Sequence, residues 1–98
     1  MKLKDWREEI DLIDSQIVKL IGQRSRVVSK IGTLKAKAGI DIHDPKREEE
    51  ILRNAVSNAD GNLCEATILS IYRRILVESR QIQIDASKIA RNEEAGIY

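Results

Sequence analysis

Apolar residues recur at intervals of three and four positions over the first third of the chain. They are Trp6, Ile10, Ile13, Ile17, Leu20, Ile21, Val27, Val28, Ile31 and Leu34. This spacing places them on one face of an amphipathic helix. Only Gly22 and Gly32 weaken the pattern, and each is tolerable at about 1 kcal/mol. We therefore predict one long helix from Leu3 to Ala38, ended by Gly39, a residue favoured just after helix C-termini.

Two further helices are predicted downstream. Asp44-Pro45 is a strong helix start, with Asp as the N-cap and Pro in the first helical position, and a short apolar face follows it. Residues 57–62 have the composition of a turn. A third helix is expected from about Leu63 to about Ala90. The sequence thus predicts an all-α domain over residues 1–90, with a C-terminal tail, 91–98, that frays.

The length of the first helix has a consequence for assembly. A helix of about 35 residues is a rod of roughly 50 Å, whereas a compact chain of this size has a radius of gyration of only about 13 Å. Two shorter helices cannot cover such a rod, so we expect a second chain to cover it in a homodimer. The alternative is a plain coiled coil, which is disfavoured because charges interrupt the apolar stripe.

Composition narrows the class of protein. The net charge of +1 gives no overall field that would attract nucleic acid or a membrane surface. No apolar run approaches transmembrane length, and the N-terminus has no hydrophobic signal core. One Cys and one His exclude an internal disulfide and disfavour a zinc site. We expect a cytoplasmic protein that uses no metal.

The charges that interrupt the apolar stripe are the informative feature. Arg24 and Lys35 lie eleven residues apart, so they share one face of the first helix. Either one alone could extend its charged end to solvent, but the two together favour an anion site, since a buried cation needs a partner. Arg7 lies 28 residues before Lys35, or roughly 42 Å along the helix. Only an antiparallel partner chain could bring Arg7 to this site, and two-fold symmetry would then create two equivalent sites.

The other two helices carry similar candidates. Ser79 and Gln83 lie one turn apart beside the apolar stripe of the third helix. A bond from Ser79 back to its own helix would explain that residue equally well. Arg47 follows the second helix start, where a surface ion pair with a neighbouring glutamate is the alternative. Asp44 is expected to act as the cap itself, and Glu48 could be only a helix-start acid.

These residues together resemble a known family. The segments WREEIDLIDSQIVKLIGQRSRVV, GTLKAKAGIDIHDPKREEEIL and ILVESRQIQ look like the all-helical chorismate mutases, over about residues 6–83. The resemblance implies three helices per chain, with two chains intertwined around their long first helices in an antiparallel homodimer. It also implies the Claisen rearrangement of chorismate to prephenate, a step in phenylalanine and tyrosine biosynthesis that needs no cofactor.

The resemblance also implies roles for the residues. Arg24 would hold one substrate carboxylate, Arg7 of the partner chain would reach the other, and Arg47 would assist at a carboxylate. Lys35 and Gln83 would flank the ether oxygen of the breaking bond. An amide donates a hydrogen bond at any pH, so the resemblance implies a rate that is roughly flat from pH 5 to pH 8.

The ring hydroxyl would be received by Glu48 and by the backbone at Asp44, with Ser79 lining the pocket. Relatives that cleave isochorismate or rearrange 4-amino-4-deoxychorismate keep the same fold. The Asp-Pro-Lys-Arg-Glu helix start favours the mutase over the lyase, but the amino substrate stays open because it differs at the group that Glu48 would contact. A non-catalytic helical dimerisation or regulatory module is the other alternative. Fusion to, or association with, another enzyme of the shikimate pathway also stays open.

Overall fold

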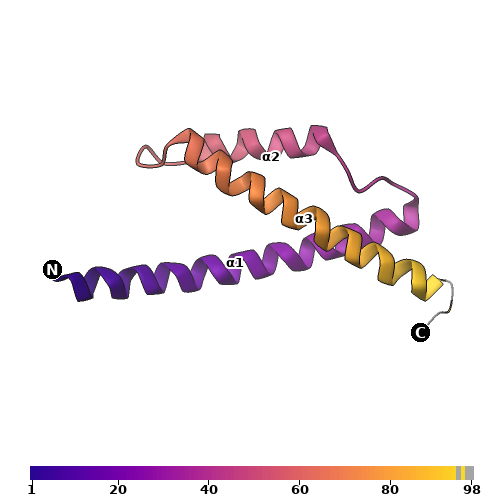
Figure 1. Cartoon of the computed structure of the whole chain (residues 1–98), viewed down its shortest axis with the longest axis horizontal. Coiled ribbons are helices and arrows are strands. Elements are labelled where there is room, and N and C mark those ends of the chain that lie inside the picture. Colours follow the sequence, from indigo (N-terminus) through magenta and orange to yellow (C-terminus); the bar gives the residue numbers. More distant parts are fainter. Residues whose placement is uncertain (95, 97–98) are drawn as a thin grey trace.

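The computed structural model describes residues 1–94 and 96, and these residues form three helices. Helix α1 spans Leu3–Ala38, α2 spans Pro45–Asn58 and α3 spans Glu65–Glu94 (Figure 1). No strand occurs among the described residues. The predicted all-α fold of one long, one short and one further long helix is confirmed.

The ends of α1 and the start of α2 agree with the local sequence signals. Gly39 follows α1 with φ 68° and ψ 29°, a left-handed conformation that glycine adopts without strain. In the connector that follows, the side chain of Asp44 accepts a hydrogen bond from the Arg47 backbone N–H at 3.1 Å, and Pro45 occupies the first turn. The Asp-Pro pair is thus the predicted helix cap.

Three boundaries differ from the sequence prediction. Helix α3 begins at Glu65, two residues after the predicted start near Leu63. The turn expected at 57–62 begins later, because α2 continues through Asn58. Helix α3 extends to Glu94, four residues beyond the predicted end near Ala90. The Arg91 guanidinium donates to the side chain of Ser87 at 2.8 Å, one turn earlier, and this bond stabilises the added turn. Residues 95, 97 and 98 lie outside the described residues, so fraying of the end of the chain stays a prediction.

The start of α3 is preceded by Cys64, which is exposed. Its carbonyl accepts the Ile68 N–H at 3.1 Å. Hydrogen bonds from the backbone N–H groups of Thr67 and Ala66 lower the pKa of the Cys64 thiol. Free N–H groups of the first helical turn favour an anionic side chain in this way.

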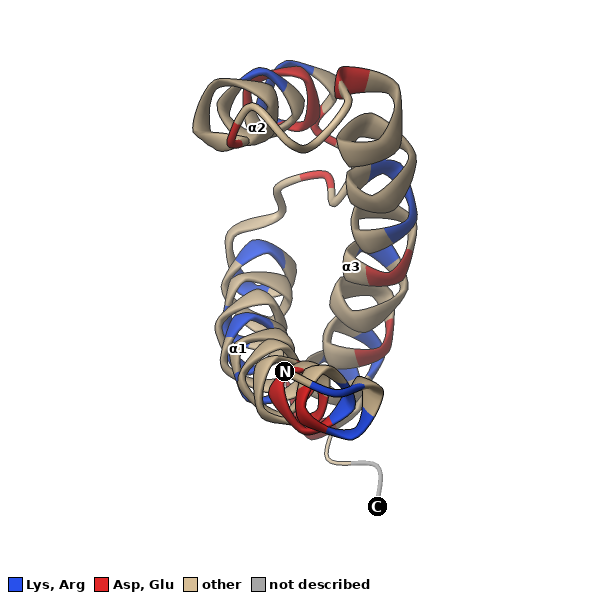
Figure 2. Ribbon diagram, turned by 90° about the vertical axis from the view of Figure 1, so that its left-hand side faces the viewer, with Lys and Arg blue, Asp and Glu red and all other residues tan. Residues whose placement is uncertain are grey.

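Helix α3 connects the other two helices. It crosses the C-terminal half of α1 and packs along α2, while the N-terminal part of α1 projects away from both (Figure 1). Viewed along α1, helices α1 and α2 lie apart and α3 runs from one to the other (Figure 2). No helix in the described part of the chain combines the length and apolar character that a membrane span needs.

The single chain leaves most of its apolar residues exposed. Along α1, the exposed fraction is 53% for Trp6, 69% for Leu12 and 61% for Leu20. The buried apolar residues are few, and most are small: Val28, Ala55, Leu76, Ala86 and Ala90. The radius of gyration is 17.4 Å, compared with about 13 Å for a compact chain of this length. A single chain therefore has an incomplete core, and the apolar face of α1 needs further cover.

Candidate active site

A cavity of about 230 Å³ lies between the three helices. Seven of the eight predicted site residues line it, although they are spread over 60 positions of the sequence. They are Arg24 and Lys35 of α1, Asp44 of the connector, Arg47 and Glu48 of α2, and Ser79 and Gln83 of α3. Arg7 does not line the cavity; it lies exposed in the N-terminal part of α1.

The remaining walls of the cavity are mainly apolar. Val28 and Ile31 of α1, Ile42 of the connector, Ile51 of α2 and Leu76 of α3 lie between the polar side chains. Such walls exclude water, and charges act on one another more strongly where the local dielectric is low. The cavity therefore combines cationic groups with an apolar lining, as a site for an organic anion requires.

Arg24 is held across the helix crossing by Ser79. Its guanidinium donates to the Ser79 hydroxyl, and that hydroxyl donates in turn to the Ile75 carbonyl at 2.8 Å. The back-bond considered as an alternative for Ser79 is thus present, and the same hydroxyl also accepts from Arg24. Ser79 is buried, with only 6% of its surface exposed. The arrangement fixes Arg24 at the cavity wall without neutralising its charge.

Lys35 has a free charge in the same wall. Its ammonium donates to the Ile42 carbonyl at 3.1 Å, which leaves two of its three N–H donors for other acceptors. Lys35 takes part in none of the ion pairs found within residues 1–94. The connector carbonyl orients the ammonium, and an anionic ligand would be its counter-ion.

Gln83 lies one turn after Ser79, and the polar atoms of its side chain lack good hydrogen bonds. Its side-chain nitrogen lies 3.4 Å from the Ser79 carbonyl, at the long limit for a hydrogen bond. Its side-chain oxygen is buried and has no hydrogen-bond partner among the described residues. Since buried polar groups are nearly always paired, this carboxamide is available to a ligand.

Gly32 sets the distance between the helices that carry Lys35 and Gln83. A Cβ atom at Gly32 would lie 2.7 Å from both the Cα and the carbonyl oxygen of Gln83. Real Cβ atoms do not approach backbone atoms this closely, so only glycine allows the crossing. In the sequence alone Gly32 is only a weak point of α1; the structure gives it a packing role next to the site.

Replacing Gly32 by alanine should push α3 away from α1 at Gln83. We expect a loss of about 1–3 kcal/mol in the free energy of unfolding, typical of overpacking. Turnover should fall about tenfold or more, because small misplacements of reacting groups are costly. Urea unfolding and steady-state kinetics measure the two effects.

Gly22→Ala is the matched control for that substitution. The nearest atom to a Cβ at Gly22 is the flexible end of Arg26, at 3.9 Å. Alanine there should stabilise the helix by about 0.5–1 kcal/mol and leave turnover unchanged. Equal behaviour of the two variants would refute the packing role of Gly32.

The α2 side of the cavity carries two ion pairs. Arg47 lies 2.5 Å from Glu50, and both side chains are more than half exposed. This is the surface pair that the sequence allowed as an alternative, and it leaves Arg47 at the cavity edge. Glu48 lies 3.1 Å from Nε of Arg80 on α3. Arg80 is not among the predicted site residues, although it lies one turn after the buried Leu76 and so interrupts an apolar stripe as Arg24 does.

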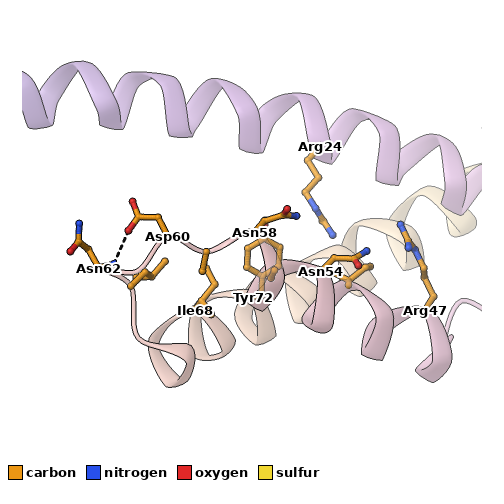
Figure 3. A pocket seen from close by; sticks show the side chains of 12 residues that line it. Arg24, Arg47, Asn54, Asn58, Asp60, Asn62, Ile68 and Tyr72 are labelled. Carbon is orange, nitrogen blue, oxygen red and sulfur yellow. Dashed lines mark hydrogen bonds between the residues drawn. The ribbon is translucent and has the colours of Figure 1, made fainter.

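A wider groove of about 760 Å³ continues from the cavity towards the start of α3. Arg24 of α1 and Arg47 of α2 line both spaces and extend towards each other across the gap (Figure 3). The other polar residues of the groove are Asn54, Asn58, Asp60 and Asn62. The cavity is therefore open towards the groove on the side where Arg24 and Arg47 lie.

Known proteins resemble this chain in sequence and in structure. It is 42% identical over 83 residues to the chorismate mutase of Methanocaldococcus jannaschii, covering 84% of each chain. It is 38% identical over 79 residues to the bifunctional chorismate mutase/prephenate dehydratase of Aquifex aeolicus, covering 76% of this chain but only 22% of that protein. The structure of a Thermus thermophilus chorismate mutase (form II) superposes with a TM-score of 0.81 at 30% identity, covering 85% of this chain and 94% of the other. Residues 6–84 match the family described as chorismate mutase type II, and the chain belongs to this family.

Proposed function

We propose that this chain catalyses the unimolecular rearrangement of chorismate to prephenate in aromatic amino acid biosynthesis. The observation that carries the proposal is the convergence of Arg24, Lys35 and Gln83 on one cavity with apolar walls. A pericyclic rearrangement needs no nucleophile, base or metal from the protein. It needs a bound conformation in which the two carbon atoms that bond lie close together, and stabilisation of the charge that develops.

The arginines supply the first requirement. Chorismate carries two carboxylates, and arginine binds a carboxylate with two parallel hydrogen bonds. Arg24 and Arg47 line the cavity from α1 and α2; Arg24 would bind one carboxylate, and Arg47 would assist at a carboxylate beside Arg7 of the partner chain. Holding both carboxylates selects the compact reactive conformer. The conformational entropy is then lost on binding and not in the chemical step, so the barrier of that step is lower.

Lys35 and Gln83 supply the second requirement. Cleavage of the carbon–oxygen bond runs ahead of carbon–carbon bond formation, so negative charge grows on the ether oxygen. An ammonium and an amide N–H placed at that oxygen stabilise the transition state more than the ground state. The Ile42 carbonyl orients the Lys35 ammonium. Nε2 of Gln83 makes one long contact, to the Ser79 carbonyl, and has a second N–H that can donate to the ether oxygen.

The proposed active form is an antiparallel homodimer in which Arg7 enters the site of the partner chain. Three observations support it. The apolar face of α1 is exposed over most of its length, above all in its N-terminal part, the chain is extended over 59 Å, and the groove beside Arg24 and Arg47 is open. A second α1 packed antiparallel would cover the apolar face and bring its Arg7 towards these arginines.

An assay of the purified protein tests the function directly. Chorismate, isochorismate and 4-amino-4-deoxychorismate are supplied separately and the products are followed by absorbance, with sedimentation analysis of the same sample. We expect prephenate from chorismate, and a dimer. Salicylate from isochorismate would indicate the lyase instead. No turnover, with no thermal stabilisation by a bicyclic transition-state analogue, would indicate a non-catalytic module.

The rate of the wild-type enzyme should be roughly flat from pH 5 to pH 8, because the Gln83 amide donates in every protonation state. A Gln83→Glu variant should differ sharply. Only the protonated acid donates to the ether oxygen, so its activity should be highest at low pH. It should fall about tenfold per pH unit above the pKa of the carboxyl. Steady-state rates in buffers of constant ionic strength measure both profiles, and parallel profiles would exclude this role for Gln83.

The wider setting forms part of the proposal. Cys64 is the single cysteine and is compatible with the reducing cytoplasm, which we propose as the location. The chain spans 22% of the Aquifex protein and 21% of a Haemophilus influenzae relative named T-protein. Fusion to, or association with, another shikimate-pathway enzyme such as a prephenate dehydratase is consistent with these relatives.

A further inference from the structure

Arg80 and Glu48 form the one ion pair, within residues 1–94, that joins two helices. Nε of Arg80 on α3 lies 3.1 Å from Oε2 of Glu48 on α2, and both residues line the cavity. The other four ion pairs of these residues join positions three or four apart on a single helix and are largely exposed. Glu48 is more protected, with 23% of its side chain exposed, while 41% of the Arg80 side chain is exposed and its charge is partly screened by solvent. This pair is therefore set apart from the ordinary surface charges.

The contact is electrostatic rather than a well-directed hydrogen bond. Nε of Arg80 is buried, yet no acceptor among the described residues lies where its N–H could form a hydrogen bond of normal geometry. The charge of the guanidinium attracts Oε2 and so restrains that side of the Glu48 carboxylate. A carboxylate has four lone-pair sites on two oxygens, so Oε1 of Glu48 keeps acceptor capacity for a ligand in the cavity.

We propose that Arg80 is a positioning residue for Glu48 and sets the preference of the site for a ring hydroxyl over a ring amine. The proposal rests on the proposed function, in which Glu48 receives the ring substituent. A carboxylate whose charge is compensated by a guanidinium is a good acceptor for a neutral O–H. It is a poor counter-ion for an ammonium, because the ammonium would be placed a few ångströms from a second cation.

The opposite case shows why the pair determines selectivity. Without Arg80, Glu48 would be an uncompensated carboxylate beside an apolar wall. Such a group attracts a cation strongly, since opposite charges at low dielectric gain more than a neutral hydrogen bond does. The substrate with an amine in place of the hydroxyl would then lose its disadvantage. The guanidinium of Arg80 thus repels the substrate ammonium, and this repulsion distinguishes the two substrates.

The test compares kcat/KM for chorismate and for 4-amino-4-deoxychorismate in the wild type and in Arg80→Gln. We expect the wild type to favour the hydroxyl, and the ratio to fall about tenfold or more in Arg80→Gln. Arg80→Lys keeps the positive charge and should restore most of the ratio. Where the amine is not turned over, its inhibition constant against chorismate replaces kcat/KM, and it should fall about tenfold in Arg80→Gln.

Arg53→Gln is the matched control. Arg53 pairs with Glu49 one turn away on α2, its side chain is 70% exposed, and it does not line the cavity. Its removal should leave the substrate ratio unchanged, and thermal unfolding should show that each variant is folded. If Arg80→Gln slows both substrates equally, Arg80 only braces α2 against α3 and the proposal is wrong. If the wild type acts on neither substrate, the proposed function fails before this question arises.

Discussion

Lys35→Ala should lower the turnover of chorismate by about 100-fold or more, the loss expected when a charged donor is removed from a developing oxyanion. The charge on the ether oxygen exists chiefly in the transition state, so kcat and kcat/KM should fall together. The fold should survive. Among the described residues, the Lys35 side chain makes one hydrogen bond, to the Ile42 carbonyl, and it has no ion-pair partner whose charge would be left unpaired.

Lys37→Ala is the matched control for this variant. Lys37 lies in the same last turn of α1 and carries the same charge near the same negative helix end. It is exposed and does not line the cavity. Circular dichroism and steady-state kinetics on both variants separate catalysis from helix stability. Near-normal turnover of a folded Lys35→Ala protein would contradict the assignment of Lys35 to the ether oxygen.

The helices could be predicted because their signals are local. Gly39 ends α1 through its own backbone conformation, and Asp44 caps α2 through a bond to a residue three positions away. The C-terminal end of α3 was placed too early, since the bond between Arg91 and Ser87 depends on side-chain rotamers that apolar periodicity does not report. Local signals therefore predict the capped end of α1 and the capped start of α2 better than the two ends of α3.

The site was predictable only in part, for the same reason. Arg24 and Lys35 stood out as cations on an apolar stripe, which needs knowledge of one helix alone. The contact of Glu48 with Arg80 depends on how α2 packs against α3. The close approach of Gly32 to Gln83 depends on how α3 crosses α1. Neither contact can be inferred until the helices are assembled, so the sequence indicated Arg24, Lys35 and Gln83 but neither Arg80 nor the contacts that position Glu48 and Gln83.

Mixing two inactive variants should restore activity if the site is shared between chains. Arg7→Ala and Arg24→Ala should each be nearly inactive alone, since each removes a carboxylate-binding arginine from every site. Unfolding and refolding them together in equal amounts makes about half of the dimers mixed. Each mixed dimer contains one site with Arg24 from one chain and Arg7 from the other, so about a quarter of wild-type activity should return.

The matching control mixes Arg24→Ala with Lys35→Ala. Both side chains line the cavity of one and the same chain, so every site in a mixed dimer lacks one of the two groups, and no activity should return. Activity recovered in the first mixture but not in the second requires that Arg7 acts across the interface. If the first mixture stays as inactive as its components, Arg7 does not serve the partner's site. The arginine that binds the second carboxylate would then have to come from the same chain, where Arg47 already lines the cavity.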